Sequence, residues 1–357
     1  MDDTDQLRNN LATWLQTRLV GATAVEVTRL EAPRSGYSAE TTVVDAIVTR
    51  GEQRTSERFV VRAETPEPAV YPVQNEELDV EIEIQYRAMS AVAAHSTVPV
   101  AALIGYEAAQ SIIGTQFFVM GYVNGDVPIE DPIYTSDGFF AHASPAQRAA
   151  LLRNGLQVLA AVHNIDWTTA GLDWLVPDGV APGLRHQLDT WTAYAHRELG
   201  DRVHPLLDET FGWLYQNLPV DPPLGLCWGD PRPGNIIWND FKVACVTDFE
   251  ACSIAPPEMD LGWWLMFDRW SHETYGVPRL PGEQTRAEQT EIYESFLGRS
   301  VGDTYWYEVF AAARYCAIVV RIMNRYVQRG LMPADQTVWI ENPAVTCLID
   351  LLDLPDR

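Results

Sequence analysis

Residues 228–250 read Trp-Gly-Asp-Pro-Arg-Pro-Gly-Asn-Ile-Ile-Trp-Asn-Asp-Phe-Lys-Val-Ala-Cys-Val-Thr-Asp-Phe-Glu. The stretch predicts a strand–turn–strand unit that carries Asp230, Asn235 and Asp248. Mg²⁺ takes oxygen ligands and completes its shell with phosphate and water, so one or two side chains suffice, and Asn235 and Asp248 fit that role. Three oxygen-bearing side chains gathered in this way are what magnesium-dependent phosphoryl transfer from a nucleotide requires.

The spacing suggests a role for each of the remaining polar residues. Asp230 lies five positions before Asn235, so a loop can turn its carboxylate toward an acceptor hydroxyl while the asparagine faces the metal. A carboxylate there orients the hydroxyl and accepts its proton late in the transfer. Arg232 can reach the transferred phosphoryl oxygens, where a planar cation stabilises developing charge. We expect Glu250 to hold a second metal or the acceptor.

Gly-Asp-x-x-x-x-Asn, followed by a strand and Asp-Phe-Glu, resembles the catalytic and metal-binding loops of the protein-kinase-like superfamily. More narrowly, the chain resembles the aminoglycoside phosphotransferase-like (choline-kinase-related) family over about residues 20–330. That family usually has His-Gly-Asp where this chain has Trp228-Gly229-Asp230, which we interpret as the mark of a subfamily. The alternative is a turn-rich hairpin whose acidic residues are merely solvated.

The resemblance implies a two-lobed, protein-kinase-like α+β fold, with ATP and Mg²⁺ as cofactors. A small N-terminal nucleotide-binding lobe, an antiparallel sheet plus a helix, would occupy residues 1–120, and an inter-lobe linker residues 121–127. A larger, mainly helical lobe for catalysis and acceptor binding would occupy residues 128–357.

The N-terminal third contains three β-branched runs that predict strands, at residues 25–30, 41–49 and 59–63. Between the first two lies a short run of small residues that resembles the family's nucleotide loop. There Ser35, Gly36 and Ser38 would let backbone N–H groups approach phosphates. An ordinary hairpin turn explains the run equally well.

The phosphate-binding pair of the family is altered in this chain. The only lysine is Lys242, so the family's third-strand lysine is replaced by Arg62, which can bind phosphate but with a different geometry. The alternative for Arg62 is a solvated edge-strand charge. On the helix predicted over residues 75–95, Gln85 takes the place of the family's glutamate, and Glu81, one turn earlier, could substitute for it.

A strand at residues 117–120 and the following turn resemble the linker that pairs with adenine. The resemblance places Met120 at the back of the nucleotide pocket, with the Gly121 carbonyl and the Val123 N–H facing the base. A buried strand ending in a turn would look similar. Beyond it, helices are predicted at residues 145–164, 186–199, 203–217, 285–298 and 303–329, with one opening at Asp260. Asp260 is expected to brace the catalytic loop, and His163 to be a packed structural histidine.

Composition narrows the function classes. The formal charge of −24 argues against nucleic-acid or anionic-membrane partners, and its spread along the chain is typical of a solvated acidic surface. No apolar run approaches the roughly eighteen residues that span a bilayer. The first residues lack the pattern of a signal peptide, and five scattered cysteines suggest a reducing, cytoplasmic compartment. Oligomeric state is not indicated.

Two interpretations of the acceptor are open, and in both it is a small molecule with a hydroxyl group. It is an aminoglycoside-like or other alcohol, or it is a hydroxyacyl thioester or other lipophilic alcohol, which an apolar, Trp-rich C-terminal lobe would suit. A third hypothesis, motivated by the altered lysine–glutamate pair, is a nucleotide-binding regulatory protein with vestigial activity. The intact Asp230, Asn235 and Asp248 argue against it.

Overall fold

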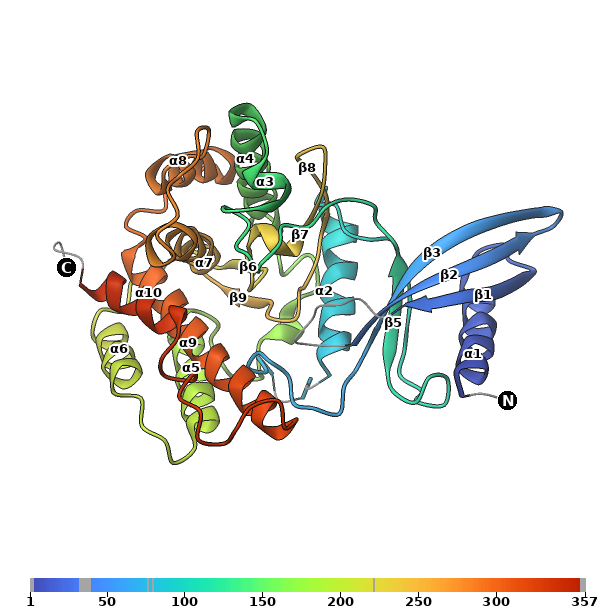
Figure 1. The fold of residues 1–357 in the computed structure, drawn as a ribbon, viewed down its shortest axis with the longest axis horizontal. Coiled ribbons are helices and arrows are strands. Elements are labelled where there is room, and N and C mark those ends of the chain that lie inside the picture. Colours follow the sequence, from blue (N-terminus) through green and yellow to red (C-terminus); the bar gives the residue numbers. More distant parts are fainter. Residues whose placement is uncertain (1–2, 32–39, 76, 79, 221, 354–357) are drawn as a thin grey trace.

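The structure is a computed structural model that describes residues 3–31, 40–75, 77–78, 80–220 and 222–353. It has the predicted α+β architecture, with an N-terminal antiparallel sheet and a mainly helical C-terminal part (Figure 1). The predicted phosphate-contacting loop at Ser35, Gly36 and Ser38 lies outside the described residues.

The N-terminal sheet has five antiparallel strands in the order β1-β2-β3-β5-β4. Side chains alternate between the two faces of a strand. Phe117 and Val119 of β5 therefore pack with helix α1 on one face, while Phe118 packs with helix α2 on the other. The three predicted strands are confirmed as β1 to β3. The elements are α1 (Asp3–Arg18), β1 (Ala24–Glu31), β2 (Glu40–Arg50), β3 (Gln53–Ala63), α2 (Glu81–His95), β4 (Leu103–Glu107) and β5 (Phe117–Gly121).

Helix α2 begins at Glu81, six residues later than the sequence pattern predicts. The reason is local hydrogen bonding. The Asn75 side chain accepts from the Glu77 N–H at 3.1 Å and donates to the Trp174 carbonyl at 3.0 Å, which holds the chain in a turn. The first turn of α2 is capped from a distance, because Ile82 N–H donates to the Glu64 carboxylate at 3.1 Å. Residues 64–75 form an irregular segment between β3 and α2.

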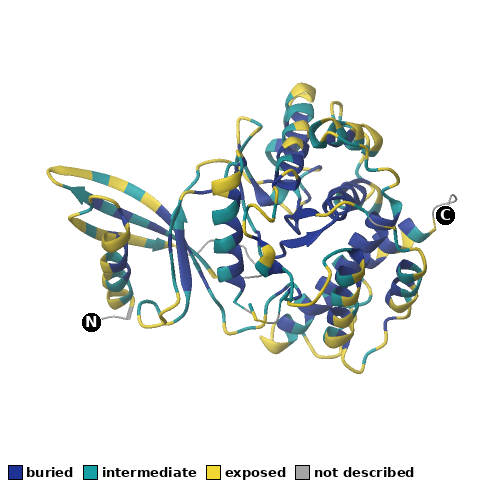
Figure 2. Cartoon of the chain, turned by 180° about the vertical axis from the view of Figure 1, so that it is seen from behind, coloured by how far each residue is buried: buried dark blue, intermediate teal, exposed yellow. Residues whose placement is uncertain are grey.

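The C-terminal part is mainly helical, and the five helices predicted over defined ranges are confirmed to within two residues. The helices Gly138–Ala141 and Pro343–Leu352 were not predicted. Helix α4 begins as predicted at Pro145, because Ser144 and Gln147 form a reciprocal capping box. Figure 2 shows buried residues concentrated on the inner faces of these helices, whereas the outer ends of β1 to β3 are exposed. The helices are α3 (Gly138–Ala141), α4 (Pro145–His163), α5 (Leu184–Leu199), α6 (Pro205–Gln216), α7 (Glu258–Arg269), α8 (Arg286–Leu297), α9 (Tyr305–Gln328) and α10 (Pro343–Leu352).

Two small two-stranded sheets lie between the N-terminal sheet and the helices. Strand β6 (Gly225–Cys227) pairs with β9 (Ser253–Ala255), and β7 (Ile236–Asn239) pairs with β8 (Lys242–Val246). The chain that leaves β5 is tied to the second pair by two hydrogen bonds of 2.8 Å between the backbones of Asp126 and Trp238. The loops of these pairs therefore face the junction between the two parts. Among the described residues, no helix is both long enough and apolar enough to cross a bilayer.

Candidate active site

The loop after β6 brings Asp230 into the junction through an unusual backbone turn. Gly229 has φ +99°, and a Cβ at this position would lie 2.2 Å from the Ala251 carbonyl oxygen. Only glycine avoids both problems. The turn therefore presses the Asp230 loop against the segment that follows Asp248.

Asp260 holds this loop through hydrogen bonds to its backbone. Its carboxylate is fully buried and accepts from the backbone N–H groups of Trp228 at 2.6 Å and Gly229 at 3.1 Å. His163 Nε2 lies 3.0 Å from the same carboxylate, and His163 Nδ1 lies 2.6 Å from the Tyr293 hydroxyl. This geometry suits the bracing role expected for Asp260 and a structural role for His163.

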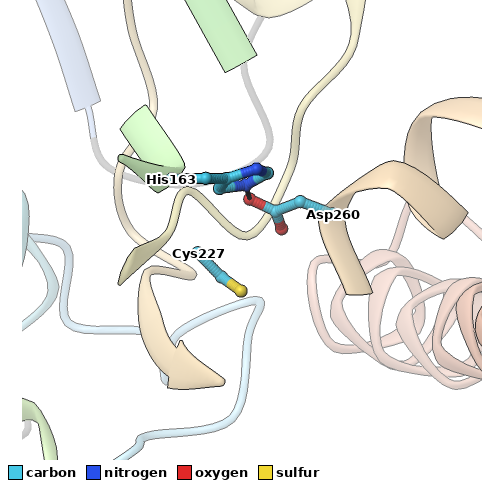
Figure 3. A group of neighbouring side chains, drawn as sticks. All are labelled: His163, Cys227 and Asp260. Carbon is cyan, nitrogen blue, oxygen red and sulfur yellow. Dashed lines mark hydrogen bonds and ion pairs between the residues drawn. The ribbon is translucent and has the colours of Figure 1, made fainter. Parts of the chain in front are cut away.

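Figure 3 shows His163, Asp260 and Cys227 side by side. One ring nitrogen, one carboxylate oxygen and the sulfur lie within 4.8 Å of one another. The histidine and the carboxylate already bond the catalytic loop and a tyrosine. Burial raises the pKa of the Cys227 thiol well above its usual value, so it stays protonated. Its Sγ lies 3.4 Å from the Pro256 carbonyl oxygen, as a thiol donor would. The hydrogen bonds of His163 and Asp260 brace the catalytic loop.

Trp228, which replaces the family's usual histidine, joins the two functional loops. Its indole N–H is shared between the carbonyls of Thr247, at 2.7 Å, and Asp248, at 3.0 Å. The ring is fully buried. These contacts give Trp228 a structural part in the loop, in keeping with its interpretation as the mark of a subfamily.

Asp230 and Asn235 are each only 4% exposed, which excludes a hairpin of solvated acidic residues. Asn235 Nδ2 donates to Asp230 Oδ2 at 2.7 Å and to the Asp230 carbonyl at 3.0 Å. This use of the amide nitrogen leaves the amide oxygen, an atom type that Mg²⁺ takes, for other partners. The same carboxylate accepts from Tyr71 Oη at 2.9 Å, Arg232 Nε at 3.2 Å and Trp263 Nε1 at 2.7 Å.

Asp248 follows β8 with a left-handed backbone, at φ +57°. Arg62 of β3 places its guanidinium 3.3 Å from the Asp248 carboxylate and 3.9 Å from that of Glu250, and bonds the Thr41 hydroxyl at 3.0 Å. The Arg62 side chain is only 12% exposed, so it is not a solvated edge-strand charge. The structure brings Arg62 to the predicted metal ligands.

Glu250 forms hydrogen bonds with Glu81 and Gln85, the two α2 residues that the sequence analysis proposed as partners of Arg62. Gln85 Nε2 donates to its carboxylate at 3.2 Å, and the Glu81 side chain shares a hydrogen bond with it. Burial, with the negative charges of Glu81 and Asp248, raises the pKa of Glu250 well above its usual value. A cation would offset this concentration of carboxylates. The donor set of Asn235, Asp248 and Glu250, an amide and two carboxylates, therefore fits Mg²⁺.

The predicted adenine contacts lie at the end of β5. Met120 pairs with Val60 of β3, and Gly121 N–H donates to the Ala102 carbonyl at 2.8 Å. Val123 follows directly where the chain leaves the sheet. The structure places these residues at the junction, and their contact with adenine stays a prediction.

A pocket opens beside Arg232, with a volume of about 600 Å³ that includes open solvent. Arg232 Nη1 bonds the Glu130 carboxylate at its mouth while Arg232 Nε bonds Asp230. Its wall is mainly apolar and aromatic, from Ile129, Ile133, Tyr134, Leu152, Trp264, Phe267, Trp270 and Tyr315. A volume of this order suits a small molecule. The sequence predicted Arg232 as a phosphoryl contact, whereas here it also borders this pocket.

Sequence reasoning missed several residues that contact the catalytic loop. Trp263 lies one helical turn after Asp260, so its position on the same face of α7 was readable. Arg314 of α9 donates to the Gly229 carbonyl at 2.9 Å and stacks on Trp263, with 4.6 Å to the ring centroid. Tyr71 lies 159 residues before Asp230, and no local pattern marks it.

Comparison with known proteins agrees with this geometry. A family model described as "Phosphotransferase enzyme family" matches residues 31–294. A structure from Ralstonia eutropha assigned to the aminoglycoside phosphotransferases superposes with a TM-score of 0.67 at 23% identity, covering 96% of this chain and 94% of that one. A choline/ethanolamine kinase family protein from Mesorhizobium loti gives a TM-score of 0.53 at 13% identity, covering 99% and 96%. A ternary complex of streptomycin, ATP and APH(2")-IIa gives 0.51 at 12% identity, covering 88% and 94%.

Curated relatives add a second kind of similarity. The chain is 30% identical over 226 residues to acyl-CoA dehydrogenase family member 11 of Rattus norvegicus, which covers 61% of this chain and 26% of that protein. The human protein of the same name is 31% identical over 180 residues, covering 48% and 21%. The chain thus spans about a quarter of the length of these relatives. Since the family model covers most of the chain, the protein belongs to the phosphotransferase enzyme family.

Proposed function

We propose that this protein transfers the γ-phosphate of ATP to the hydroxyl of a lipophilic alcohol, with a hydroxyacyl thioester as the first candidate. The observation that supports the proposal is a buried Asp230 that bonds Asn235 and Arg232, where Arg232 also lines an apolar pocket. Trp228 ties the same loop to the Asp248 backbone. Asp230 is the group that orients the acceptor hydroxyl and accepts its proton. Arg232, between Asp230 and the pocket, is placed to contact the phosphoryl group or the acceptor.

Asn235, Asp248 and Glu250 would hold Mg²⁺, which would neutralise charge on the nucleotide phosphates. Arg62 would then contact phosphate oxygens with the guanidinium that bonds Asp248 here. Glu81 and Gln85 would support that arrangement through Glu250. Met120, Gly121 and Val123 would line the adenine site.

The pocket favours an apolar acceptor over a polycation such as an aminoglycoside. Two carboxylates belong to its lining, Glu130 and Asp268, and each is paired with an arginine. Paired carboxylates offer little net attraction to an amine-rich ligand, whereas the aromatic wall gains free energy by burying an acyl chain. The names of the curated relatives point in the same direction, because they refer to an acyl thioester, acyl-CoA.

The first experiment measures ADP release from Mg²⁺–ATP with hydroxyacyl-CoA thioesters, the free hydroxy acids, choline and aminoglycosides as acceptors. We expect the hydroxyacyl compounds to stimulate release most, and Asp230→Ala to abolish the stimulation while nucleotide binding, measured by calorimetry, persists. Asp201→Ala, which removes an exposed carboxylate of the same lobe, is the control and should behave as wild type. Stimulation that survives Asp230→Ala would contradict the role assigned to this carboxylate.

A second experiment tests the pocket. Ile129 lines it and is 38% exposed, and Val180, also 38% exposed, lies outside its lining. We expect Ile129→Asp to raise the KM for a hydroxyacyl acceptor about tenfold with the KM for ATP unchanged, because a charge replaces apolar contact area. Val180→Asp should change neither constant. Equal effects of the two variants would remove the acceptor from this pocket.

The regulatory alternative also has an observation in its favour. Arg62 pairs with Asp248 and approaches Glu250, so its guanidinium offsets the charge of the two carboxylates that we predict to bind the metal. If the protein only senses nucleotide, Mg²⁺–ATP should bind but no acceptor in the panel should accelerate ADP release. Turnover that depends on both Asp230 and an acceptor would exclude this alternative.

A further inference from the structure

The chain between β3 and α2 passes from the sheet to the helical part (Figure 1), and its residues 68 and 69 contact α9. We call residues 64–75 the crossing segment. It carries Tyr71, whose hydroxyl donates to Asp230 Oδ2 at 2.9 Å. Burial, with the negative charges of Asp230 and Glu250, raises the pKa of Tyr71 well above its usual value, so the phenol keeps its proton and acts as a donor.

With Tyr71 in place, the Oδ2 atom of Asp230 is saturated. Tyr71, Arg232 and Asn235 all donate to Oδ2, whose two lone pairs they fill, and Trp263 donates to Oδ1. A substrate hydroxyl must bond the carboxylate before it can give up its proton. An acceptor hydroxyl that takes Oδ2 therefore displaces one of the donors.

Three of these donors are held by their own surroundings. Asn235 also donates to the Asp230 carbonyl, and Trp263 is buried and stacked on Arg314. Arg232 is the next residue but one in the same loop and also bonds Glu130. Among the described residues that bond Asp230, Tyr71 alone comes from outside the C-terminal part. It is the donor that can withdraw without disturbing the catalytic loop.

The backbone around Tyr71 is fixed. Arg321 of α9 donates to the carbonyls of Pro68 and Ala69, at 2.5 and 3.2 Å, and the Tyr194 hydroxyl bonds the Val70 carbonyl. Val70 itself is buried. A movement of the whole crossing segment would break these contacts together. Rotation of the Tyr71 side chain would break one hydrogen bond and an edge contact with Trp191, whose ring centroid lies 6.5 Å away.

A second, smaller pocket lies beside the ring. It is lined by Tyr71, Glu81, Glu250, Leu78, Ile84 and Trp174 among others. Tyr71 thus borders this pocket and also bonds Asp230. Rotation of the side chain toward the pocket would free Asp230 while the backbone stays anchored.

We infer that the Tyr71 hydroxyl occupies the place of the acceptor hydroxyl on Asp230, excludes water from it, and is displaced by the acceptor. Tyr71 is on this account a positioning residue that couples acceptor binding to transfer, and a safeguard against ATP hydrolysis. The inference rests on the proposed function, because it takes Asp230 as the group that binds the acceptor hydroxyl.

The test is Tyr71→Phe, which removes the hydroxyl and keeps the ring. ADP release from Mg²⁺–ATP is measured without acceptor and with the best acceptor of the panel. We expect acceptor-independent hydrolysis to rise about tenfold, the order of one hydrogen bond to a charged group, and the KM for the acceptor to fall, with kcat nearly unchanged. Unchanged hydrolysis, or no measurable hydrolysis in either protein, would overturn the inference.

Tyr194→Phe is the matched control, because it removes a buried phenol that holds the crossing segment but does not touch Asp230. It should leave hydrolysis at the wild-type level. An equal rise in this variant would mean that loosening of the segment, and not the Tyr71 hydroxyl, admits water, which overturns the assignment. Phosphate found on Tyr71 by mass spectrometry after incubation with Mg²⁺–ATP would also overturn it, since the phenol would then be an acceptor.

The outcomes separate the inference from the proposed function. Acceptor-stimulated transfer with unchanged hydrolysis in Tyr71→Phe leaves the function standing and removes the safeguard. Raised hydrolysis without stimulation by any acceptor supports the role of Tyr71 and contradicts the acceptor class.

Discussion

Replacement of Asp260 by asparagine tests whether the catalytic loop depends on one buried carboxylate. Asp260 and His163 both have fully buried side chains, and the Asp260 oxygens accept from Trp228 N–H, Gly229 N–H and His163. An amide can accept at one of these two oxygen positions only. Whichever way the new side chain turns in Asp260→Asn, its NH₂ group meets an N–H donor, so a bond to a charged group is lost and a buried donor is left without a partner.

Each of these changes costs about 1–3 kcal/mol, so we expect the free energy of unfolding to fall by about 3 kcal/mol, which is roughly a hundredfold in the folded-to-unfolded ratio. The activity should fall as well, because Gly229 N–H positions the residue before Asp230. Urea denaturation followed by tryptophan fluorescence measures the first effect, and ADP release under native conditions measures the second.

The exposed pair of His196 and Asp208 is a matched control. Its nitrogen and oxygen lie 3.2 Å apart, close to the 3.0 Å of the buried pair, but its side chains are 59% and 47% exposed. Asp208→Asn should cost less than about 1 kcal/mol, since water and ions screen such pairs. If the two substitutions destabilised the protein equally, or if Asp260→Asn kept full activity, the argument that burial makes Asp260 the support of the loop would be refuted.

Two further predictions concern the backbone turn and the dependence of stability on pH. Gly229→Ala should lower kcat at least about tenfold, because the new Cβ would lie 2.2 Å from the Ala251 carbonyl oxygen. Gly276 has φ +64°, and a Cβ there would meet nothing within 4 Å. Gly276→Ala should therefore show only the strain of its backbone, with a near-normal kcat. Burial lowers the pKa of His204, whose Nδ1 accepts from Leu207 N–H at the start of α6 and must be unprotonated to do so. Protonation is thus easier in the unfolded chain than in the folded one. Thermal unfolding should therefore show that the protein loses stability as the pH falls below about 6.5, the pKa of histidine in the unfolded chain. His204→Asn keeps a capping acceptor and should remove that part of the loss. The same pH profile in both proteins would argue against this role of His204.

Much of the fold could be predicted from local patterns. The β-branched runs predicted β1 to β3, and the helical pattern from residue 145 predicted α4, because hydrophobic periodicity acts over a few residues. Asp230, Asn235 and Asp248 could be proposed as site residues for a similar reason, since they share one short strand–turn–strand unit. The start of α2 was wrong by six residues because its cap is Glu64, which lies at the end of the preceding strand.

The sequence by itself thus determined many of the helices and strands and the residue types of the central loop, which are encoded by neighbouring residues. Tertiary structure alone decided which distant side chains surround Asp230. Tyr71 and Arg314 reach the loop from segments that are distant in the chain, and no local pattern marks either contact. A contact between distant residues depends on how whole elements pack, and the identity of a single residue does not record that packing.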